Sequence, residues 1–176
     1  MEHGHIDDED ITASSAFDFK SVGPQNARLR KDHFGGAWCP KKTIAPGIRE
    51  WIQIDLKKAY RITRTATQGR YGSGRGQEYA EAFQLEYWRP DFGNETDSWV
   101  TYKNHSGHTI LKGNTNTYVV NVQLLNPPIV ASKVRFIPHS RHSRTVCMRV
   151  EVFGCLYNDE KENGDIIGKA NPITYR

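Results

Sequence analysis

Apolar and polar residues alternate along several short stretches of the chain. Ile52, Ile54 and Leu56 alternate with polar residues, and successive side chains of a strand point to opposite faces of a sheet. The same period of two recurs at residues 83–88, 118–124, 133–136 and 148–152. Gly, Pro and Asn residues separate these stretches, and helical periodicity is scarce. The pattern predicts an all-β domain of the sandwich or jelly-roll type, with the apolar face of each strand against a core.

The length of the chain suits one such core. Its 176 residues, 37% of them hydrophobic, are enough for a single domain. Residues 158–176 are mostly polar and are expected to form a linker or tail. No run of about eighteen apolar residues is present, so we expect no membrane span in this chain. The first residues lack the basic and then apolar character of a secretion signal, so none is expected here.

A charged, glycine-rich segment lies between two of the predicted strands. Residues 67–79 hold four of the fifteen glycines together with Arg70, Arg75 and Glu78. The glycine spacing does not match a dinucleotide or P-loop motif, and a strand rather than a helix is predicted to follow. Nucleotide binding is therefore disfavoured. Loops of this composition on a rigid frame usually contact a ligand.

The charge distribution leaves the class of partner open. The net charge is +4, and basic residues cluster at 61–75 and 141–144, which fits an acidic partner. No zinc-finger, helix-turn-helix or aromatic ribonucleoprotein pattern is present, so no nucleic-acid partner is expected.

The motifs that suggest catalysis or metal binding are weak. Asp91-Phe-Gly93 copies a kinase triplet, but it lacks the other kinase motifs and is expected to form a turn. The histidine pairs at 105 and 108 and at 139 and 142 would bind a metal only if further ligands joined them. We therefore expect no enzyme activity, no cofactor and no metal site. The residues neither support calcium binding nor exclude it.

The chain contains three cysteines and two sequons. Cys39, Cys147 and Cys155 are an odd number, which in a secreted protein suggests one disulfide and one cysteine with a partner outside the chain. Asn94 and Asn104 each begin an Asn-X-Ser/Thr triplet in a polar stretch and are candidate glycosylation sites.

Seven blocks of residues, in one order, resemble a discoidin domain. They are Ile11-Thr-Ala-Ser-Ser15, Gly36-Ala-Trp-Cys-Pro40, Trp51-Ile-Gln-Ile-Asp-Leu56, Thr67-Gln-Gly-Arg70, Pro127-Pro-Ile-Val-Ala131, Val134-Arg-Phe-Ile-Pro138 and Cys147-Met-Arg-Val-Glu151 with Gly154-Cys155. Within that superfamily, which includes the C-type domains of coagulation factors and the neuropilins, the chain particularly resembles the discoidin domain receptors, which are collagen-binding receptor tyrosine kinases.

The resemblance implies the boundaries and the fold. Residues 10–157 would form an eight-stranded discoidin jelly-roll barrel with ligand-binding loops at one end, after a lead-in of residues 1–9. It also implies a Cys39–Cys147 disulfide. The family's partner for Cys155 would precede residue 4 and has no counterpart here, so Cys155 is expected to be unpaired in this chain.

The resemblance also implies a collagen-contacting surface on four loops. Phe17 matches an exposed tryptophan of the family, and Arg70 and Glu78 match a basic and an acidic binding residue. Gly35 stands where the family has an acidic residue, which Asp18 or Asp32 could replace. The complete set of predicted ligand-binding residues is Phe17, Asp18, Ser21, Trp38, Arg70, Arg75, Glu78, Arg144 and Thr145.

Several residues keep a purely structural alternative. Arg70 and Glu78 could form a surface salt bridge worth about 0 to 1 kcal/mol without contacting any ligand. Phe17 and Phe19 could be buried in a small satellite core. Arg135 and Arg149 lie on the predicted polar faces of strands and are expected to pair with Glu86 or Glu151 across the sheet.

The expected function is that of an extracellular module that recognises fibrillar or basement-membrane collagen. It would serve as the sensor in the ectodomain of a plasma-membrane receptor tyrosine kinase, whose kinase domain lies elsewhere, and the full-length receptor could dimerise. One alternative is a discoidin domain that binds anionic phospholipid or glycan, for which Phe17, Phe19 and Phe34 are the candidate hydrophobic spikes. Another is a structural adhesion module.

Overall fold

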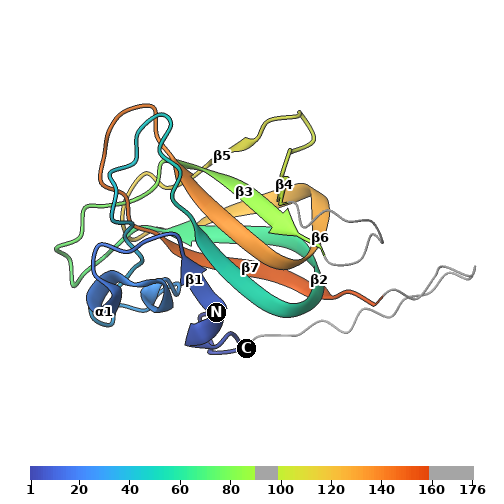
Figure 1. Ribbon diagram of the computed structural model, residues 1–176, viewed down its shortest axis with the longest axis horizontal. Helices are drawn as coiled ribbons and strands as arrows, with labels where there is room; N and C mark the ends of the chain where they lie inside the picture. The colour runs from blue at the N-terminus through green and yellow to red at the C-terminus, as the bar shows by residue number, and fades with distance from the viewer. Residues whose placement is uncertain (90–98, 159–176) are drawn as a thin grey trace, which may run out of the picture.

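The computed structural model describes residues 1–89 and 99–158 and shows an antiparallel β-structure (Figure 1). Three short helical turns, η1 (Asp8–Asp10), α1 (Phe19–Val22) and η2 (Pro24–Asn26), lie near the N-terminus. The strands are β1 (Ile11–Ala13), β2 (Ile52–Gln68), β3 (Ala82–Trp88), β4 (Val100–Thr101), β5 (Ile110–Lys112), β6 (Asn121–His139) and β7 (Arg149–Leu156). The all-β prediction is confirmed. In the described part of the chain no helix is long and apolar enough to cross a membrane.

The long strands β2 and β6 connect the two layers of the fold. Their first pairing, between Ile52–Asp55 and 133–136, lies beside β1 on one side and β3 on the other, and β4 and β5 pair with β3. Beyond a register shift, residues 60–67 of β2 pair with 121–131 of β6, and β7 pairs with β2 on its other side. Figure 1 shows both strands bending between the two parts. A jelly-roll sandwich results.

The strand count differs from the one implied by the family resemblance. The described residues contain seven strands rather than eight, and their hydrogen-bonded order, β1-β2-β6-β3-β4 with β5 and β7 as branches, does not close into a ring. β2 and β6 each continue through the bend as a single strand that serves both layers.

One apolar core fills the space between the layers. Phe83 and Phe136 from one layer and Ile62 and Val150 from the other belong to the same buried cluster. Most of the predicted alternation is confirmed: Ile52, Ile54 and Leu56 are buried, as are Val134, Phe136, Met148 and Val150. The core therefore follows directly from the period of two.

The prediction for residues 118–124 was wrong about which side chains are buried. Val122 and Leu124 are 54% and 67% exposed, while Leu125 is buried. Leu124 lies opposite Arg64, whose guanidinium lies over the ring of Phe153. Alternation shows that a strand has two faces, but it does not show which face another layer covers.

The predicted ion pairs of two arginines are also corrected. Arg135 donates a hydrogen bond from Nε to Gln53 at 2.9 Å, and its guanidinium lies over the rings of Trp51 and Trp99, at 4.3 and 3.7 Å from their centroids. Arg149 is buried and donates to backbone carbonyls, as described below. Glu86 pairs with Arg49, and Glu151 pairs with the amino group of Met1. Arg135 therefore interacts with aromatic rings and Arg149 with backbone carbonyl groups. The strand pattern predicted neither kind of partner.

The disulfide between Cys39 and Cys147 is present, as predicted. The adjacent residues Trp38 and Met148 exchange backbone hydrogen bonds of 3.0 and 2.8 Å, so the bond joins two segments that already pair. Cys155 is exposed and forms no disulfide within the described residues.

Loss of this disulfide should lower stability substantially. It links residues 108 apart, so the chain-entropy model predicts that a Cys39→Ala, Cys147→Ala double variant loses about 4 kcal/mol of unfolding free energy. Urea unfolding measures this, with Cys155→Ser as a control expected to change stability by less than about 0.5 kcal/mol. A double variant as stable as the parent would refute the assignment, as would recovery of both cysteines as free thiols by non-reducing mass spectrometry.

Candidate ligand-binding surface

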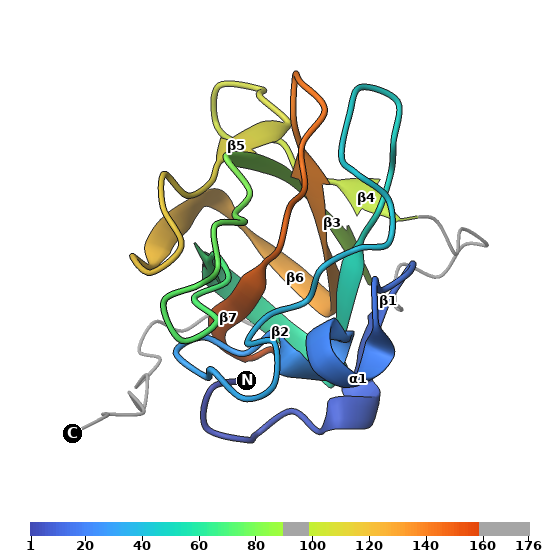
Figure 2. The ribbon, with the colours of Figure 1, turned by 90° about the vertical axis from the view of Figure 1, so that its left-hand side faces the viewer.

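Loops from several parts of the chain gather at one end of the sandwich. The segment around α1, residues 69–81 and residues 140–147 lie at the left-hand end of Figure 1 and face the viewer in Figure 2. All the predicted ligand-binding residues except Trp38 lie on these segments. The following contacts show how the loops are held together.

Arg149 is the buried anchor of this end. Its guanidinium donates to the carbonyl oxygens of Gly69, Lys31 and Thr117 at 2.7, 3.3 and 3.1 Å. Burial lowers the pKa of Arg149, an effect that the carboxylate of Asp32 opposes, and an arginine remains charged at neutral pH in either case. Three loops distant in sequence are therefore positioned by one side chain at the start of β7.

Arg70 and Glu78 face each other at the base of the glycine-rich loop. Arg70 Nη1 lies 3.2 Å from Glu78 Oε2, and the two side chains are 28% and 27% exposed. Arg70 also donates from Nε to the carbonyl of Gly35 at 2.8 Å. Arg70 and Glu78 thus form the loop-closing salt bridge that was the alternative to ligand contact. Arg70 also links the loop to Gly35. Both side chains retain exposed surface at the loop end.

Asp32 holds the tip of the same loop, and sequence reasoning considered it only as a source of negative charge. Its carboxylate oxygens accept hydrogen bonds from the amides of Gly72 and Ser73 at 2.9 and 2.7 Å. Gly72, Ser73 and Gly74 all have positive φ, at 53°, 56° and 83°, a left-handed path that favours glycine. The only sequence signal for this contact is the glycine-rich composition, which does not identify the distant carboxylate.

Aromatic side chains project from the neighbouring loops. Phe17 and Phe34 are each 76% exposed, and Phe19 is also largely exposed, so the idea of a buried satellite core is wrong. A chain of backbone contacts connects them to Arg70: Phe17 donates to the carbonyl of Cys39, and Gly35, next to Phe34, donates to the carbonyl of Ser21. Exposed apolar rings and the charged pair therefore lie on loops that are joined to one another.

Asp18 and Ser21 interact with each other at the start of α1. Asp18 accepts hydrogen bonds from the hydroxyl and the amide of Ser21, both at 2.7 Å, and caps the helical turn. These bonds lower the pKa of Asp18 below its usual value of 3.8. Because the folded-state pKa is depressed, any stability that the cap contributes is fully present above pH 3.8 and is lost as the pH falls through the folded-state pKa.

The remaining predicted residues differ in accessibility. Trp38 is fully buried, and its Nε1 donates a hydrogen bond to the carbonyl of Ser15. The predicted ligand contact by this side chain is therefore corrected, because a buried ring does not reach the surface. The Trp38 ring instead packs beneath the loops. Arg75 and Thr145 are exposed. Arg144 pairs with Glu81, and its guanidinium lies over the ring of Tyr79. Partial burial acts to lower the pKa of Arg144, but the hydrogen bonds to Glu81 and Tyr79 outweigh this effect, so the pKa is raised.

The other candidate sites are less informative. Asn104 accepts hydrogen bonds from the amides of Ser106 and His108, so its sequon forms a turn. Asn94 lies outside the described residues. Within residues 1–89 and 99–158, no three His, Cys, Asp or Glu side chains come together as a metal site.

Comparison with known proteins identifies the family of this fold. The model of the F5/8 type C domain matches residues 10–152. The chain belongs to the F5/8 type C, or discoidin, domain family. This matches the resemblance seen in the seven sequence blocks.

Relatives of this discoidin domain include two receptors. It is 48% identical over 157 residues to discoidin domain-containing receptor A of Caenorhabditis elegans, covering 89% of this chain and 20% of the relative. It is 35% identical over 159 residues to the human epithelial discoidin domain-containing receptor 1, covering 90% of this chain and 17% of the relative. The chain thus spans at most a fifth of the length of these receptors.

A solved structure with the same fold is discoidin II of Dictyostelium discoideum. The TM-score is 0.65 at 19% identity, covering 86% of this chain and 57% of that one. At this identity the similarity supports the fold of the discoidin domain and not its ligand.

Replacement of Arg149 should loosen the whole loop end. Arg149→Met would leave three buried or half-buried carbonyl groups without their donor, and we expect a loss of about 3 kcal/mol in unfolding free energy. Urea unfolding tests this, and hydrogen exchange should become faster at residues 31, 69 and 117 or their neighbours. Arg61→Met, at an exposed position of β2, is the matched control. Equal stability of the two variants would contradict the anchoring role.

Proposed function

We propose that this discoidin domain recognises triple-helical collagen through the loop end described above. The observation that carries the proposal is that the exposed rings of Phe17 and Phe34 and the partly exposed Arg70–Glu78 pair lie on loops at the same end of the sandwich. Relatives named as discoidin domain receptors, at up to 48% identity, support the same conclusion.

The chemistry of a triple helix suits such a surface. Its three chains have a fixed extended backbone, with glycine at the axis and the other side chains directed outward. A ligand of this kind offers rows of apolar and charged groups and loses little conformational entropy on binding, so a preformed amphiphilic surface suits it. Phe17 and Phe34 would cover apolar collagen side chains, while Arg70, Glu78 and Arg75 would bind polar ones.

In the full-length protein this domain would act as a collagen sensor outside the cell. The relatives are several times longer than the chain, and one of them is named as a receptor tyrosine kinase. We infer that the kinase domain and the membrane anchor belong to other parts of such a receptor. The discoidin domain itself would be a non-catalytic binding module.

Binding to an anionic phospholipid surface is a second candidate function. Phe17, Phe19 and Phe34 are all largely exposed at one end of the sandwich, and Lys20 and Lys31 are exposed near them. Exposed rings beside cations are typical of proteins that insert into the boundary between headgroups and acyl chains. The two functions use the same residues, so a direct comparison of ligands separates them.

The first test compares three ligands. We expect saturable binding to native collagen, at least tenfold weaker binding to the same collagen after heat denaturation, and weak binding to phosphatidylserine vesicles, because only the native helix presents the fixed side-chain array. Surface plasmon resonance and vesicle co-sedimentation measure these affinities. Equal binding to native and denatured collagen would refute the triple-helix proposal, and strong binding to vesicles alone would favour the lipid function.

A second test assigns the contacts to residues. Phe17→Ala and Arg70→Ala should each weaken collagen binding by about 1 to 3 kcal/mol if they are central contacts. Leu124→Ala and Arg64→Ala are matched controls, because both side chains are exposed on the sheet away from the loops. If Arg70→Ala lowers the melting temperature and leaves collagen affinity unchanged, then Arg70 serves only to close the loop.

A further inference from the structure

One edge of the layer formed by β2, β6 and β7 carries no charge. Residues 113–132 contain no Asp, Glu, Lys, Arg or His, although 25% of the whole chain is charged. The first half of β6 lies in this stretch and pairs with β2 on one side. On the other side the Asn121 side chain donates to the carbonyl of Lys112. Beyond it, residues 122–125 pair with no further strand among the described residues. In Figure 2 the start of β6 lies at the left-hand side of the fold, so the sheet ends there in a free edge.

The side chains along this edge are apolar. Four of them are more than half exposed, and two exposed prolines follow. Single exposed apolar residues are normal on a protein surface, but a group of them marks an interaction site. We call this group the edge patch, and its members are Tyr118, Val119, Val122, Leu124, Pro127 and Pro128.

The backbone at the start of the edge patch is held by side chains from within the domain. Asn116 Oδ1 accepts hydrogen bonds from the amides of Tyr118 and Val119 at 3.1 and 2.8 Å. Gln68 donates to the carbonyl of Tyr118 at 2.6 Å, and the buried Asn114 donates to the carbonyl of Val119 at 2.9 Å. Apolar side chains on a fixed backbone lose little conformational entropy when they bind. The edge patch is therefore preorganised.

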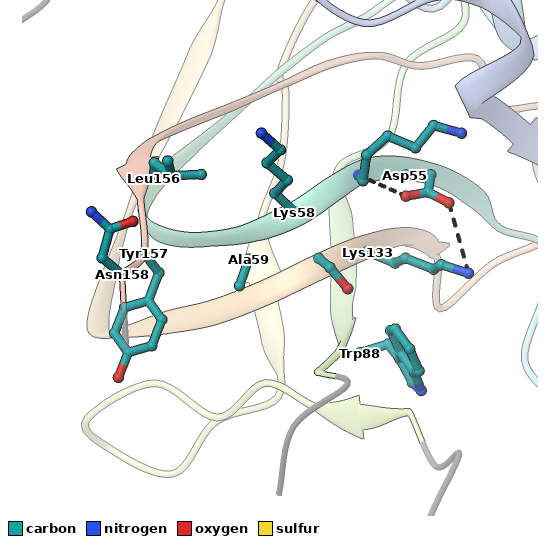
Figure 3. Close-up of a pocket in the computed structure, with 10 residues that line it drawn as sticks. Asp55, Lys58, Ala59, Trp88, Lys133, Leu156, Tyr157 and Asn158 are labelled. Atoms are coloured by element: carbon teal, nitrogen blue, oxygen red, sulfur yellow. Dashed lines mark hydrogen bonds and ion pairs between the residues drawn. The ribbon is translucent and has the colours of Figure 1, made fainter. Parts of the chain in front are cut away.

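The second half of β6 is protected, unlike the first. β3 pairs with it on the side opposite β2. Lys133 Nζ lies 3.7 Å from Asp55 and 5.1 Å from the centre of the Trp88 ring, so this half also carries a charge (Figure 3). Charged side chains are one means by which natural sheets prevent edge-to-edge association. In the first half only Pro127 and Pro128, which have no amide hydrogen, limit how far a further strand can pair.

We propose that the edge patch binds a second copy of this chain, with the two β6 strands antiparallel and related by a twofold axis at Gln123. Backbone hydrogen bonds across the axis continue the sheet from one copy into the other. In this register Val122 of each copy lies opposite Leu124 of the other, and Tyr118 lies opposite Pro128. Each of these positions thus places an apolar side chain against an apolar one.

The absence of charge selects a second copy over other occupants. The chain has a net charge of +4, so two copies repel each other unless they meet through an uncharged surface. A twofold interface must also be complementary to itself, which an uncharged apolar strip satisfies. An anionic membrane would need cations beside the apolar residues. The nearest one, Arg64, lies over the ring of Phe153 on the β7 side of β2, away from the edge.

This arrangement leaves the loop end free. β6 begins close to the loop end, since Asn121 pairs with Thr67 and Arg149 donates to the carbonyl of Thr117. Antiparallel pairing reverses the second copy, so the two loop ends lie at opposite ends of the dimer. The dimer does not cover the surface proposed to bind collagen, and the inference does not rest on that proposal.

Sedimentation equilibrium of the Cys155→Ser chain tests the association, because this variant cannot form a dimer through the exposed cysteine. We expect a reversible monomer–dimer equilibrium with Kd of about 10 to 100 μM, since one strand edge buries less surface than a standard interface. Leu124→Lys in the same background should weaken it at least tenfold by placing an unpaired charge in the interface. Val100→Lys, at an exposed position of β4, is the matched control and should change Kd by less than about twofold.

Two results of this experiment would overturn the proposal. One is a Cys155→Ser chain that stays monomeric up to about 500 μM, a concentration well above the expected Kd. The other is an equal Kd for Leu124→Lys and its parent, which would place the contact elsewhere on the molecule.

A charge swap tests the register. Val122→Lys and Leu124→Glu should each associate at least tenfold more weakly than the parent, whereas their equimolar mixture should form heterodimers. In the proposed register the new ammonium of one chain lies opposite the new carboxylate of the other, and a Leu124–Val122 contact remains. Recovery in the mixture also shows that both variants are folded. Failure of the mixture to associate, with both melting temperatures unchanged, contradicts the pairing about Gln123.

Collagen binding by the same variant keeps the two proposals apart. Leu124→Glu should bind native collagen as the parent does at about 1 μM, where both are monomeric. Retained collagen binding with lost association supports a separate edge patch. If Leu124→Glu loses both, the edge patch overlaps the loop end and the antiparallel arrangement is wrong. The sedimentation experiments need no collagen, so failure of the collagen proposal leaves them unaffected.

Discussion

The loop end of this discoidin domain depends on the guanidinium of Arg149. Much of the chain between β1 and β2 has little regular secondary structure, and the loops at 31, 69 and 117 come from three separate regions. One buried arginine provides donors in a fixed planar arrangement and satisfies a carbonyl from each of them, which a lysine cannot do with the same geometry. The disulfide between Cys39 and Cys147 holds the adjoining segment two residues away. The candidate binding surface is therefore assembled on a rigid base before any ligand arrives.

The glycine-rich loop is organised from outside itself. Arg70 binds Gly35, and Asp32 binds the amides of Gly72 and Ser73, so the loop at 70–76 and the segment at 32–36 form one unit. The glycines permit the left-handed path, and the distant carboxylate stabilises it. Because Arg70 and Glu78 already pair, ligand binding would use the exposed part of a preformed ion pair and would not require two free charges to be ordered.

The bend shared by β2 and β6 has consequences away from the loop end. The same two strands contribute to both layers of the sandwich, and the register shift that allows this leaves Ser132 opposite four residues of β2. The bend also divides β6 into a half that β3 covers and a half with a free, uncharged edge. The architecture supplies two separate surfaces, an amphiphilic one at the loops and an apolar one along the edge of β6.

The sequence by itself determined the fold class, most core positions and the family, because strand periodicity and short motif blocks are local properties that folding preserves. Ile52, Ile54, Val134 and Phe136 are examples. Through the family resemblance, the sequence also indicated the Cys39–Cys147 pair and located the loops. Tertiary structure alone decided the burial of Trp38 and Arg149, the exposure of Val122 and Leu124, and the contact of Asp32 with the loop tip. Burial depends on which elements cover each face of a strand, and the hydrogen bonds depend on which distant carbonyl or amide groups come close. The spacing of residues along one strand or loop encodes neither of these.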